Sequence, residues 1–130
     1  MNKTNSKPIF FISEKIKVIH GNYGLQIIAI DDIKKNEIIE RSPTIIIPDN
    51  EFKHKGVLGD YVFTHLEMNL SSLGLGYLSL YNHSHTPNAS YEYSYMNDKK
   101  FKNRTIITVI ANKKICKSEQ IMINYGYDVN

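Results

Sequence analysis

Apolar and polar residues alternate along much of the chain, and this alternation predicts short β-strands. Residues 15–19 (KIKVI) follow a period of two, and residues 24–30 (GLQIIAI) come after the turn-like HGNYG, so the two segments predict a hairpin. Asn36 lies between two apolar pairs in DDIKKNEIIE. Because asparagine tolerates the left-handed conformation of a tight turn, we expect a reversal near Asn36, followed by a strand through Ile38 and Ile39.

The second half of the chain continues the β pattern after an irregular middle. TIIIP predicts a strand that Pro48 ends. Between residues 49 and 80, only residues 61–68 could form a helix or a longer strand, and the pattern does not decide between them. SYEYSY, RTIITVIA and EQIMINY then predict three more strands. The predicted fold is therefore mostly β, with several short-stranded sheets and little helix.

Length and composition indicate one ordinary globular domain. The chain has 130 residues, of which 42% are hydrophobic and 22% charged, so we expect a single domain over residues 1–130. The net charge of +3 includes small basic clusters at residues 99–104 (KKFKNR) and 113–117 (KKICK), which are typical of solvated turns.

Cysteine content and the N-terminus indicate an intracellular protein. The single Cys116 excludes an internal disulfide and a zinc site built of cysteine alone, and it favours a reducing compartment. The apolar run near the N-terminus is four residues long, too short for a membrane span or a signal-peptide core. We therefore expect no membrane partner.

The turn HGNYGL is the first candidate for binding chemistry. Gly21 and Gly24 flank Asn22 and Tyr23 between two predicted strands, and glycines allow the backbone to approach a ligand closely. A plain hairpin turn with an exposed tyrosine explains the same pattern. A dinucleotide-binding fingerprint is excluded, because the third glycine is missing and no helix follows.

The segment YNHSHTPNASYEY is the second candidate. Asn82, His83 and Asn88 can form hydrogen bonds in several directions, and Pro87 makes the segment rigid. The segment predicts either a polar shelf for a ligand or a turn whose side chains satisfy their own backbone. Since His83 and His85 have no acidic or cysteine neighbour in sequence, we expect no metal site.

The third candidate is INYGYDVN near the C-terminus. Tyr125 ends an alternating segment directly before Gly126. Its phenol is either buried with a hydrogen-bonding partner or directed into a site.

These segments, taken together and in order, resemble the SET-domain protein lysine methyltransferases. HGNYGL, IKKNEII, DYVF with Tyr61, NHSHTPN and EQIMINYGYD follow one another as the signature elements of that family do, from about residue 15 to residue 128. LGLGYLSLYNHS and GDYVF look closest to the minimal viral SET proteins that methylate histone H3.

The resemblance implies a fold, a reaction and a set of site residues. It implies a SET-domain fold in which the C-terminal segment crosses the NHS strand in a knot-like arrangement. The implied reaction is transfer of a methyl group from S-adenosylmethionine to the ε-amine of a protein lysine, leaving S-adenosylhomocysteine. Tyr125 would be the catalytic tyrosine of the lysine channel, and Tyr61 would line that channel. The cofactor-binding residues would be Gly21, Asn22, Tyr23, Gly24, Asn82 and His83.

Departures from the family pattern shape the remaining expectations. With a single cysteine in the sequence, we expect no cysteine-rich post-SET zinc segment. The likeness to small viral relatives implies a homodimer, in which the second subunit could close the lysine channel. His85 stands where cysteine is usual and is expected to be a surface or turn residue; Ser79 stands where arginine is frequent.

The middle of the chain suggests an acidic groove for a basic peptide, formed by Asp49, Glu51, Asp60 and Glu67. A histone H3 tail is therefore the expected substrate. The expected location is the host nucleus if histones are the substrate, and otherwise the cytoplasm.

Two other classes of function fit the same sequence. One is a SET-like module that binds cofactor or peptide without catalysis. The other is a small β-barrel that binds nucleic acid through the basic clusters and exposed tyrosines. The second is less favoured, because the tyrosines lie on motif positions rather than among the lysines. We therefore expect no direct binding of nucleic acid.

Overall fold

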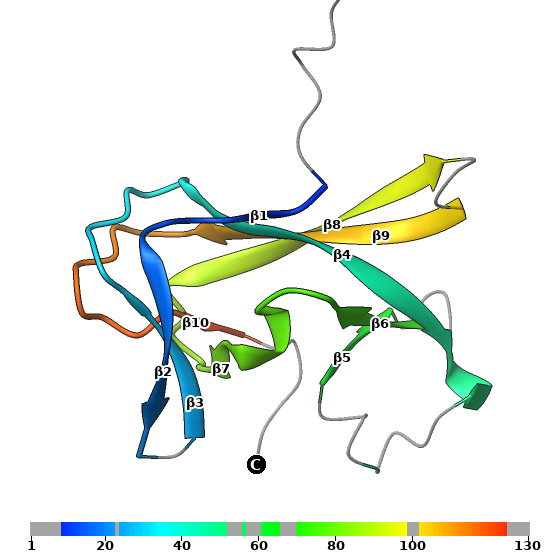
Figure 1. Cartoon of the computed structure of the whole chain (residues 1–130), viewed down its shortest axis with the longest axis horizontal. Coiled ribbons are helices and arrows are strands. Elements are labelled where there is room, and N and C mark those ends of the chain that lie inside the picture. Colours follow the sequence, from blue (N-terminus) through cyan, green and yellow to red (C-terminus); the bar gives the residue numbers. More distant parts are fainter. Residues whose placement is uncertain are drawn as a thin grey trace, which may run out of the picture.

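The described residues form three β-sheets, one of six strands and two of two strands, in keeping with the mostly β fold that the alternating pattern predicted (Figure 1). The computed structural model describes residues 9–22, 24–51, 56, 61–65, 70–98 and 102–124. No α-helix occurs in this part of the chain; two short 3-10 helices do, η2 (Asp49–Glu51) and η5 (Leu78–Leu80). The strands are β1 (Phe11–Ile12), β2 (Ile16–Gly21), β3 (Gly24–Ala29), β4 (Ile38–Pro48), β5 (Val62–His65), β6 (Leu70–Gly74), β7 (Asn82–His83), β8 (Ala89–Asp98), β9 (Lys102–Ala111) and β10 (Met122–Ile123).

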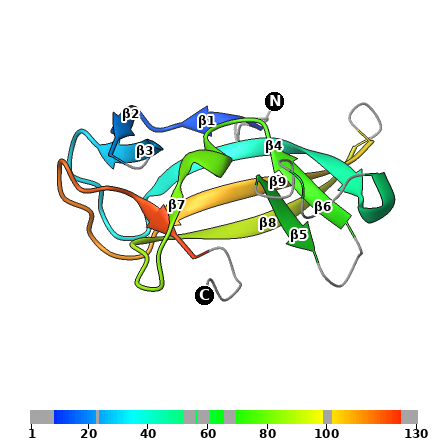
Figure 2. The ribbon, with the colours of Figure 1, turned by 90° about the horizontal axis from the view of Figure 1, so that it is seen from below.

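The largest sheet has the strand order β5-β6-β4-β9-β8, with β1 paired to β4. The hairpin β2–β3 forms a second sheet, and β7 pairs with β10 in a third. Figures 1 and 2 both show the β2–β3 hairpin toward one end of the molecule and β5 and β6 toward the other, with β7 and β10 between them. The third sheet therefore lies between the hairpin and the β5–β6 end of the largest sheet.

Two predicted reversals are confirmed. Strands β2 and β3 pair from Ile16 opposite Ala29 to Gly21 opposite Gly24, and Gly24 has a φ of 116° that favours glycine. Asn36 has a φ of 73°, as expected for an asparagine in a tight turn. The sequence signals at these turns were specific because few residue types adopt a positive φ at low cost.

Strand β4 is longer than predicted, because the two segments expected on either side of Pro43 form one strand. Its pairing with β9 runs as far as Pro43 opposite Ile106, and its pairing with β6 begins at Thr44 opposite Gly74. Pro43 thus lies where β4 changes partners. A proline at this position leaves the strand continuous, and Pro48 is its last residue, as expected.

The middle and the end of the chain differ from the expectation in extent. Residues 62–65 form a strand, which decides against a helix there, and β6 was not predicted. Strand β10 has only two residues, because the preceding residues pair with the hairpin instead: Gln120 bridges to Ile28, and the amide of Ile121 donates to the carbonyl of Ile27 at 2.8 Å.

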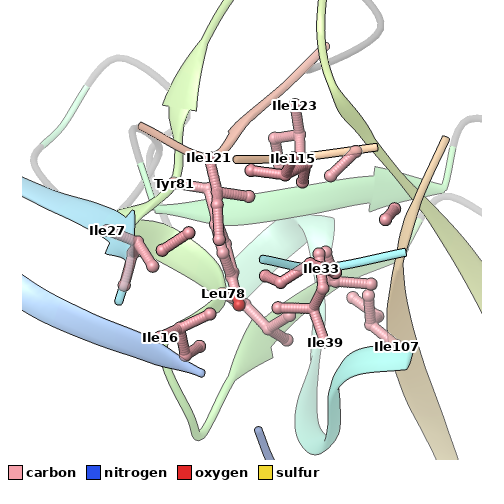
Figure 3. Packing of buried hydrophobic residues seen from close by; sticks show 14 of the residues in the cluster. Ile16, Ile27, Ile33, Ile39, Leu78, Tyr81, Ile107, Ile115, Ile121 and Ile123 are labelled. Atoms are coloured by element: carbon pink, nitrogen blue, oxygen red, sulfur yellow. The ribbon is translucent and has the colours of Figure 1, made fainter. Parts of the chain in front are cut away.

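One apolar cluster joins the three sheets (Figure 3). Its side chains come from the β2–β3 hairpin, β4, β5, η5, β8, β9, the C-terminal segment and the connections between them. The largest fully buried ones are Tyr81, Ile27, Ile33, Ile39, Leu78, Ile107, Ile115, Ile121, Ile123 and Val109. Burying one such aliphatic side chain stabilises the fold by roughly 1.5–3 kcal/mol before entropy costs. The residues around the third sheet are therefore fixed by the core.

Two similar turns lie on either side of an isolated bridge between Ile33 and Ile115. In the first, the backbone amide of Lys34 donates to a carboxylate oxygen of Glu37 at 3.0 Å. In the second, the amide of Cys116 donates to Glu119 at 2.7 Å, and Ser118 has a φ of 79°. The sequence similarity of IKKNEI and ICKSEQI explains the shared geometry.

Across the described residues, no helix has the length and apolarity needed to cross a membrane.

Candidate functional site

The NHS segment and the C-terminal segment form a parallel strand pair (Figure 2). Asn82 lies opposite Met122, and His83 lies opposite Ile123. The amide of Ser84 donates to the carbonyl of Ile123 at 2.9 Å. These are the two segments that the expected knot-like crossing brings together.

Asn88, which follows the NHS segment in the sequence, holds the C-terminal segment in place through its side-chain amide. The Asn88 side chain is 8% exposed. Its Nδ2 donates to the carbonyl of Gln120 at 2.9 Å, and its Oδ1 accepts from the amide of Met122 at 2.9 Å. One buried amide therefore satisfies two backbone groups, and it does so on the segment that leads into β10.

Asn82 connects this strand pair to the glycine turn. Its Nδ2 donates to Gln120 Oε1 at 2.7 Å and lies 3.4 Å from the carbonyl oxygen of Leu25. Leu25 directly follows Gly24, so the hairpin turn lies next to the NHS strand. Five of the six residues expected to bind cofactor, Gly21, Asn22, Gly24, Asn82 and His83, thus belong to neighbouring segments; Tyr23 lies outside the described residues.

The glycine turn leaves room for a ligand. A Cβ placed on Gly24 would meet no atom within 4 Å. Asn22 is exposed beside it. Backbone next to open space can approach a small molecule closely, which fits the role that the sequence suggested for this turn.

His83 and His85 form a ring pair. Their ring centroids lie 4.8 Å apart at an interplanar angle of 88°. His85 is exposed on a bend, which confirms its expected place at the surface. Within the described residues, no group of three or more histidine, cysteine or acidic residues could hold a metal ion.

Of the two tyrosines expected in the lysine channel, one is described. Tyr61 is 46% exposed and directly precedes β5. Its carbonyl oxygen accepts a hydrogen bond from Ser79 Oγ at 2.7 Å, which ties it to the segment leading into Asn82. Ser79, noted in the sequence only as a departure from the family pattern, thus holds the backbone of Tyr61. Tyr125 lies outside the described residues.

Glu40 is a buried carboxylate that sequence reasoning missed. It is 0% exposed on β4 and accepts hydrogen bonds from the Tyr81 hydroxyl at 2.5 Å, from the Tyr77 amide at 2.8 Å and from the Ser42 hydroxyl. Tyr81 immediately precedes Asn82, so Glu40 supports the segment that enters the NHS strand. The sequence pattern did not reveal it. Glu40, Ser42 and Thr44 are polar residues at alternate positions, which normally indicate the exposed face of a strand, but here all three are buried.

Burial raises the pKa of Glu40, and the hydrogen bonds from Ser42, Tyr81 and Tyr77 oppose that shift. The folded protein therefore holds the Glu40 proton more tightly than the unfolded chain does. Below the ordinary pKa of 4.5 the stabilising contribution of protonated Glu40 is fully present, and it is lost as pH rises through the folded pKa. Burial also raises the pKa of Tyr81, with the Glu40 charge as the next cause, so Tyr81 stays protonated throughout this range.

We expect Glu40→Gln to change how stability depends on pH. Between pH 4.5 and the folded pKa of Glu40, the wild-type protein should lose stability relative to the glutamine variant as pH rises, by at most about 1.4 kcal/mol per pH unit. Urea unfolding of both proteins from pH 4 to pH 8 measures the difference. No loss of wild-type stability relative to the variant over this range, or a relative gain with rising pH, would contradict a raised pKa for this carboxyl.

The comparisons with known proteins agree with this geometry. A family model described as SET domain matches residues 24–126. A crystal structure of a Plasmodium falciparum protein, provisionally described as a histone methyltransferase, superposes with a TM-score of 0.72; it is 38% identical, and the match covers 88% of this chain and 100% of that one. A search of curated proteins finds no match.

Two structures of ctPRC2 share the fold at lower identity. One is an autoinhibited form bound to S-adenosylmethionine, with a TM-score of 0.66 and 21% identity; the match covers 85% of this chain and 15% of that one. The other is an apo form with two substitutions in Ezh2, with a TM-score of 0.66, 22% identity and the same coverage. The mostly β fold predicted from the sequence is therefore confirmed. The nearer likeness to viral SET proteins stays a prediction.

Proposed function

Because this chain belongs to the SET-domain family, we propose that it transfers a methyl group from S-adenosylmethionine to the ε-amine of a protein lysine. S-adenosylmethionine is the methyl donor that SET-domain methyltransferases use. The observation that carries the proposal is the meeting of three segments distant in sequence: the glycine turn, the strand that begins at Asn82, and the C-terminal segment at Gln120. The 38% identity to the Plasmodium falciparum protein over nearly the whole chain supports it further.

When bound, S-adenosylmethionine supplies a methyl group on a positively charged sulfur. The lysine nitrogen forms a bond to that carbon while the carbon–sulfur bond breaks, and the sulfur keeps the electron pair. The lysine, with an ordinary pKa of about 10.4, loses its proton before attack. The chain's residues therefore need to align the two reactants rather than supply a strong acid or base.

We assign roles to the site residues on that basis. Tyr125 orients the lysine, and its phenol oxygen and ring stabilise the positive charge near the reacting methyl group. Tyr61 lines the same channel. The cofactor is held by Gly21, Asn22, Tyr23, Gly24, Asn82 and His83.

Transfer of labelled methyl groups to core histones tests the proposal. We expect wild-type protein to label a histone, and Tyr125→Phe to lower kcat by about 100-fold, the scale on which one transition-state contact acts. The Kd for S-adenosylmethionine, measured by calorimetry, should change less than about threefold, because Tyr125 is assigned to the lysine and not to the cofactor.

Tyr93→Phe is the matched control, because Tyr93 is a partly exposed tyrosine on β8 to which no role is assigned. It should retain wild-type activity. Cofactor binding without transfer to histones or to a lysine peptide library would contradict catalysis and leave the alternative of a binding module.

We propose a histone H3 tail as the substrate. The tail is basic, and the acidic residues between positions 49 and 67 suit it; of these, Glu51 is exposed on η2, whereas Asp60 and Glu67 lie outside the described residues. Separate assays with each recombinant core histone distinguish the substrates. Labelling of another core histone with none on histone H3 would overturn this assignment.

A homodimer and a nuclear location are two further proposals. A second subunit would supply a wall for the lysine channel, and an enzyme acting on histone H3 has to reach chromatin. Sedimentation at several protein concentrations measures the first, and imaging of the tagged protein in its cell measures the second. A monomer that is fully active would overturn the dimer.

A further inference from the structure

The short 3-10 helix η5 joins two parts of the candidate site. Ser79, in the middle of the helix, donates from its hydroxyl to the carbonyl oxygen of Tyr61 at 2.7 Å. The helix ends at Leu80, Tyr81 follows in an extended conformation, and Asn82 then begins β7. A displacement of η5 would therefore change the position of the Tyr61 backbone relative to the NHS strand.

Contacts outside η5 determine where it lies, because a helix of three residues has little stability of its own. Glu40 holds both of its ends. One carboxylate oxygen accepts from the Tyr77 amide before the helix at 2.8 Å, and the other accepts from the Tyr81 hydroxyl after it at 2.5 Å. Between these ends, Leu78 is 0% exposed and belongs to the apolar core (Figure 3). Buried groups thus fix η5 at both ends and in its middle.

The two parts of the site depend on η5 to different degrees. Asn82 is also held by its pairing with Met122 in the third sheet. Tyr61 lies before the first residue pair of β5, and the hydroxyl of Ser79 ties its backbone to η5. Loss of the Ser79 hydroxyl should therefore affect the part around Tyr61 and leave the NHS strand in place.

We infer that Ser79 is a positioning residue that places Tyr61 for the lysine substrate, and that Glu40 acts through η5 to hold Ser79 there. This inference rests on the proposed function, in which Tyr61 lines the lysine channel. Methyl transfer needs the amine in line with the breaking carbon–sulfur bond, and a small displacement of the groups that align the reactants lowers the rate. The lysine side of the reaction should thus depend on Ser79, whereas cofactor binding should not.

Two substitutions of Ser79 test its contact with Tyr61, through labelled methyl transfer to core histones and the calorimetric Kd for S-adenosylmethionine. Ser79→Ala removes the donor and should lower kcat/KM by about tenfold. The Kd for the cofactor should change by less than about twofold, because the NHS strand keeps its own pairing. Ser79→Thr keeps a hydroxyl and should retain at least about half of the wild-type kcat/KM.

A double-mutant cycle with Tyr81→Phe tests the path from Glu40 to Ser79. Tyr81→Phe removes one donor to Glu40 and should lower kcat/KM by about threefold in the wild-type background. In the Ser79→Ala background it should change kcat/KM by less than about 1.5-fold, because the link to Tyr61 is already absent. In urea unfolding, Tyr81→Phe should instead destabilise both backgrounds equally, since Glu40 loses the same donor in each.

The outcomes that would overturn the inference are distinct. Unchanged kcat/KM in Ser79→Ala would show that water replaces the hydroxyl at the Tyr61 carbonyl. Equal losses of cofactor binding and of methyl transfer would show general damage to the fold instead of positioning. Equal effects of Tyr81→Phe on kcat/KM in both backgrounds would remove the part assigned to Glu40. Failure of the proposed function appears separately, as an absence of transfer by the wild-type protein, and this inference then fails with it.

Discussion

Gly76→Ala is expected to lower the free energy of unfolding by about 3 kcal/mol or more, on the scale of a disrupted buried polar network. A Cβ at Gly76 would overlap with both Glu40 Oε2 and Ser42 Oγ. Both atoms belong to the hydrogen-bonded group around Glu40, so neither can move away without losing a buried partner. The added methyl group would therefore separate β4 from the segment that leads to Asn82.

Gly21→Ala is the matched control for this substitution. A Cβ at Gly21 would lie 2.8 Å from Gln26 Oε1, the mobile end of a flexible side chain that can turn away. Urea unfolding of the two variants should give a loss for Gly76→Ala at least about 2 kcal/mol larger, the scale of breaking the buried network. Similar losses would show that the Glu40 group can rearrange without cost.

Asn88→Ala is expected to cost about 2–4 kcal/mol of unfolding free energy, because it leaves two backbone groups without their partner. The carbonyl of Gln120 would lose a donor, and the amide of Met122 would lose an acceptor. Both groups lie on the segment that pairs with the NHS strand. We therefore expect cofactor binding to weaken together with stability.

Asn88→Asp tests the donor to Gln120. Aspartate keeps the acceptor for Met122 but directs a second buried oxygen at the carbonyl oxygen of Gln120, so it should be less stable than wild type although the hydrogen bond from Met122 can remain. Asn50→Ala serves as the control, since Asn50 is exposed on η2, and it should change stability by less than about 0.5 kcal/mol. Equal stability of Asn88→Ala and Asn50→Ala would show that water replaces both hydrogen bonds of Asn88.

The hairpin and the turn at Asn36 could be predicted because their signals are local. Alternation with a period of two and residues that tolerate a positive φ are properties of a few neighbouring positions. Strand β4 shows what such signals leave out. Its continuity through Pro43 depends on a change of partner from β9 to β6, which is a property of the whole sheet. The short β6 was missed because its LSSLG carries no clear pattern.

In the candidate site, too, local sequence signals could be predicted and contacts between distant residues could not. The motif resemblance found Asn82 and the glycine turn, and the structure places them in neighbouring segments. It did not find the hydrogen bonds of Glu40 and Gln120, which join residues distant in sequence. A buried glutamate on a strand of mixed polarity does not differ, in sequence alone, from an exposed one. The cofactor-binding and lysine-channel roles of all these residues, Tyr23 and Tyr125 included, stay predictions.

The parallel pairing of β7 with β10 has a kinetic consequence. Asn82 and Gln120 are 38 positions apart, and strand pairs that are distant in sequence close slowly, because the entropy of the intervening loop is lost before their contacts form. During refolding from urea, the β2–β3 hairpin should thus form before the third sheet. Affinity for the methyl donor would then return later than the hairpin does.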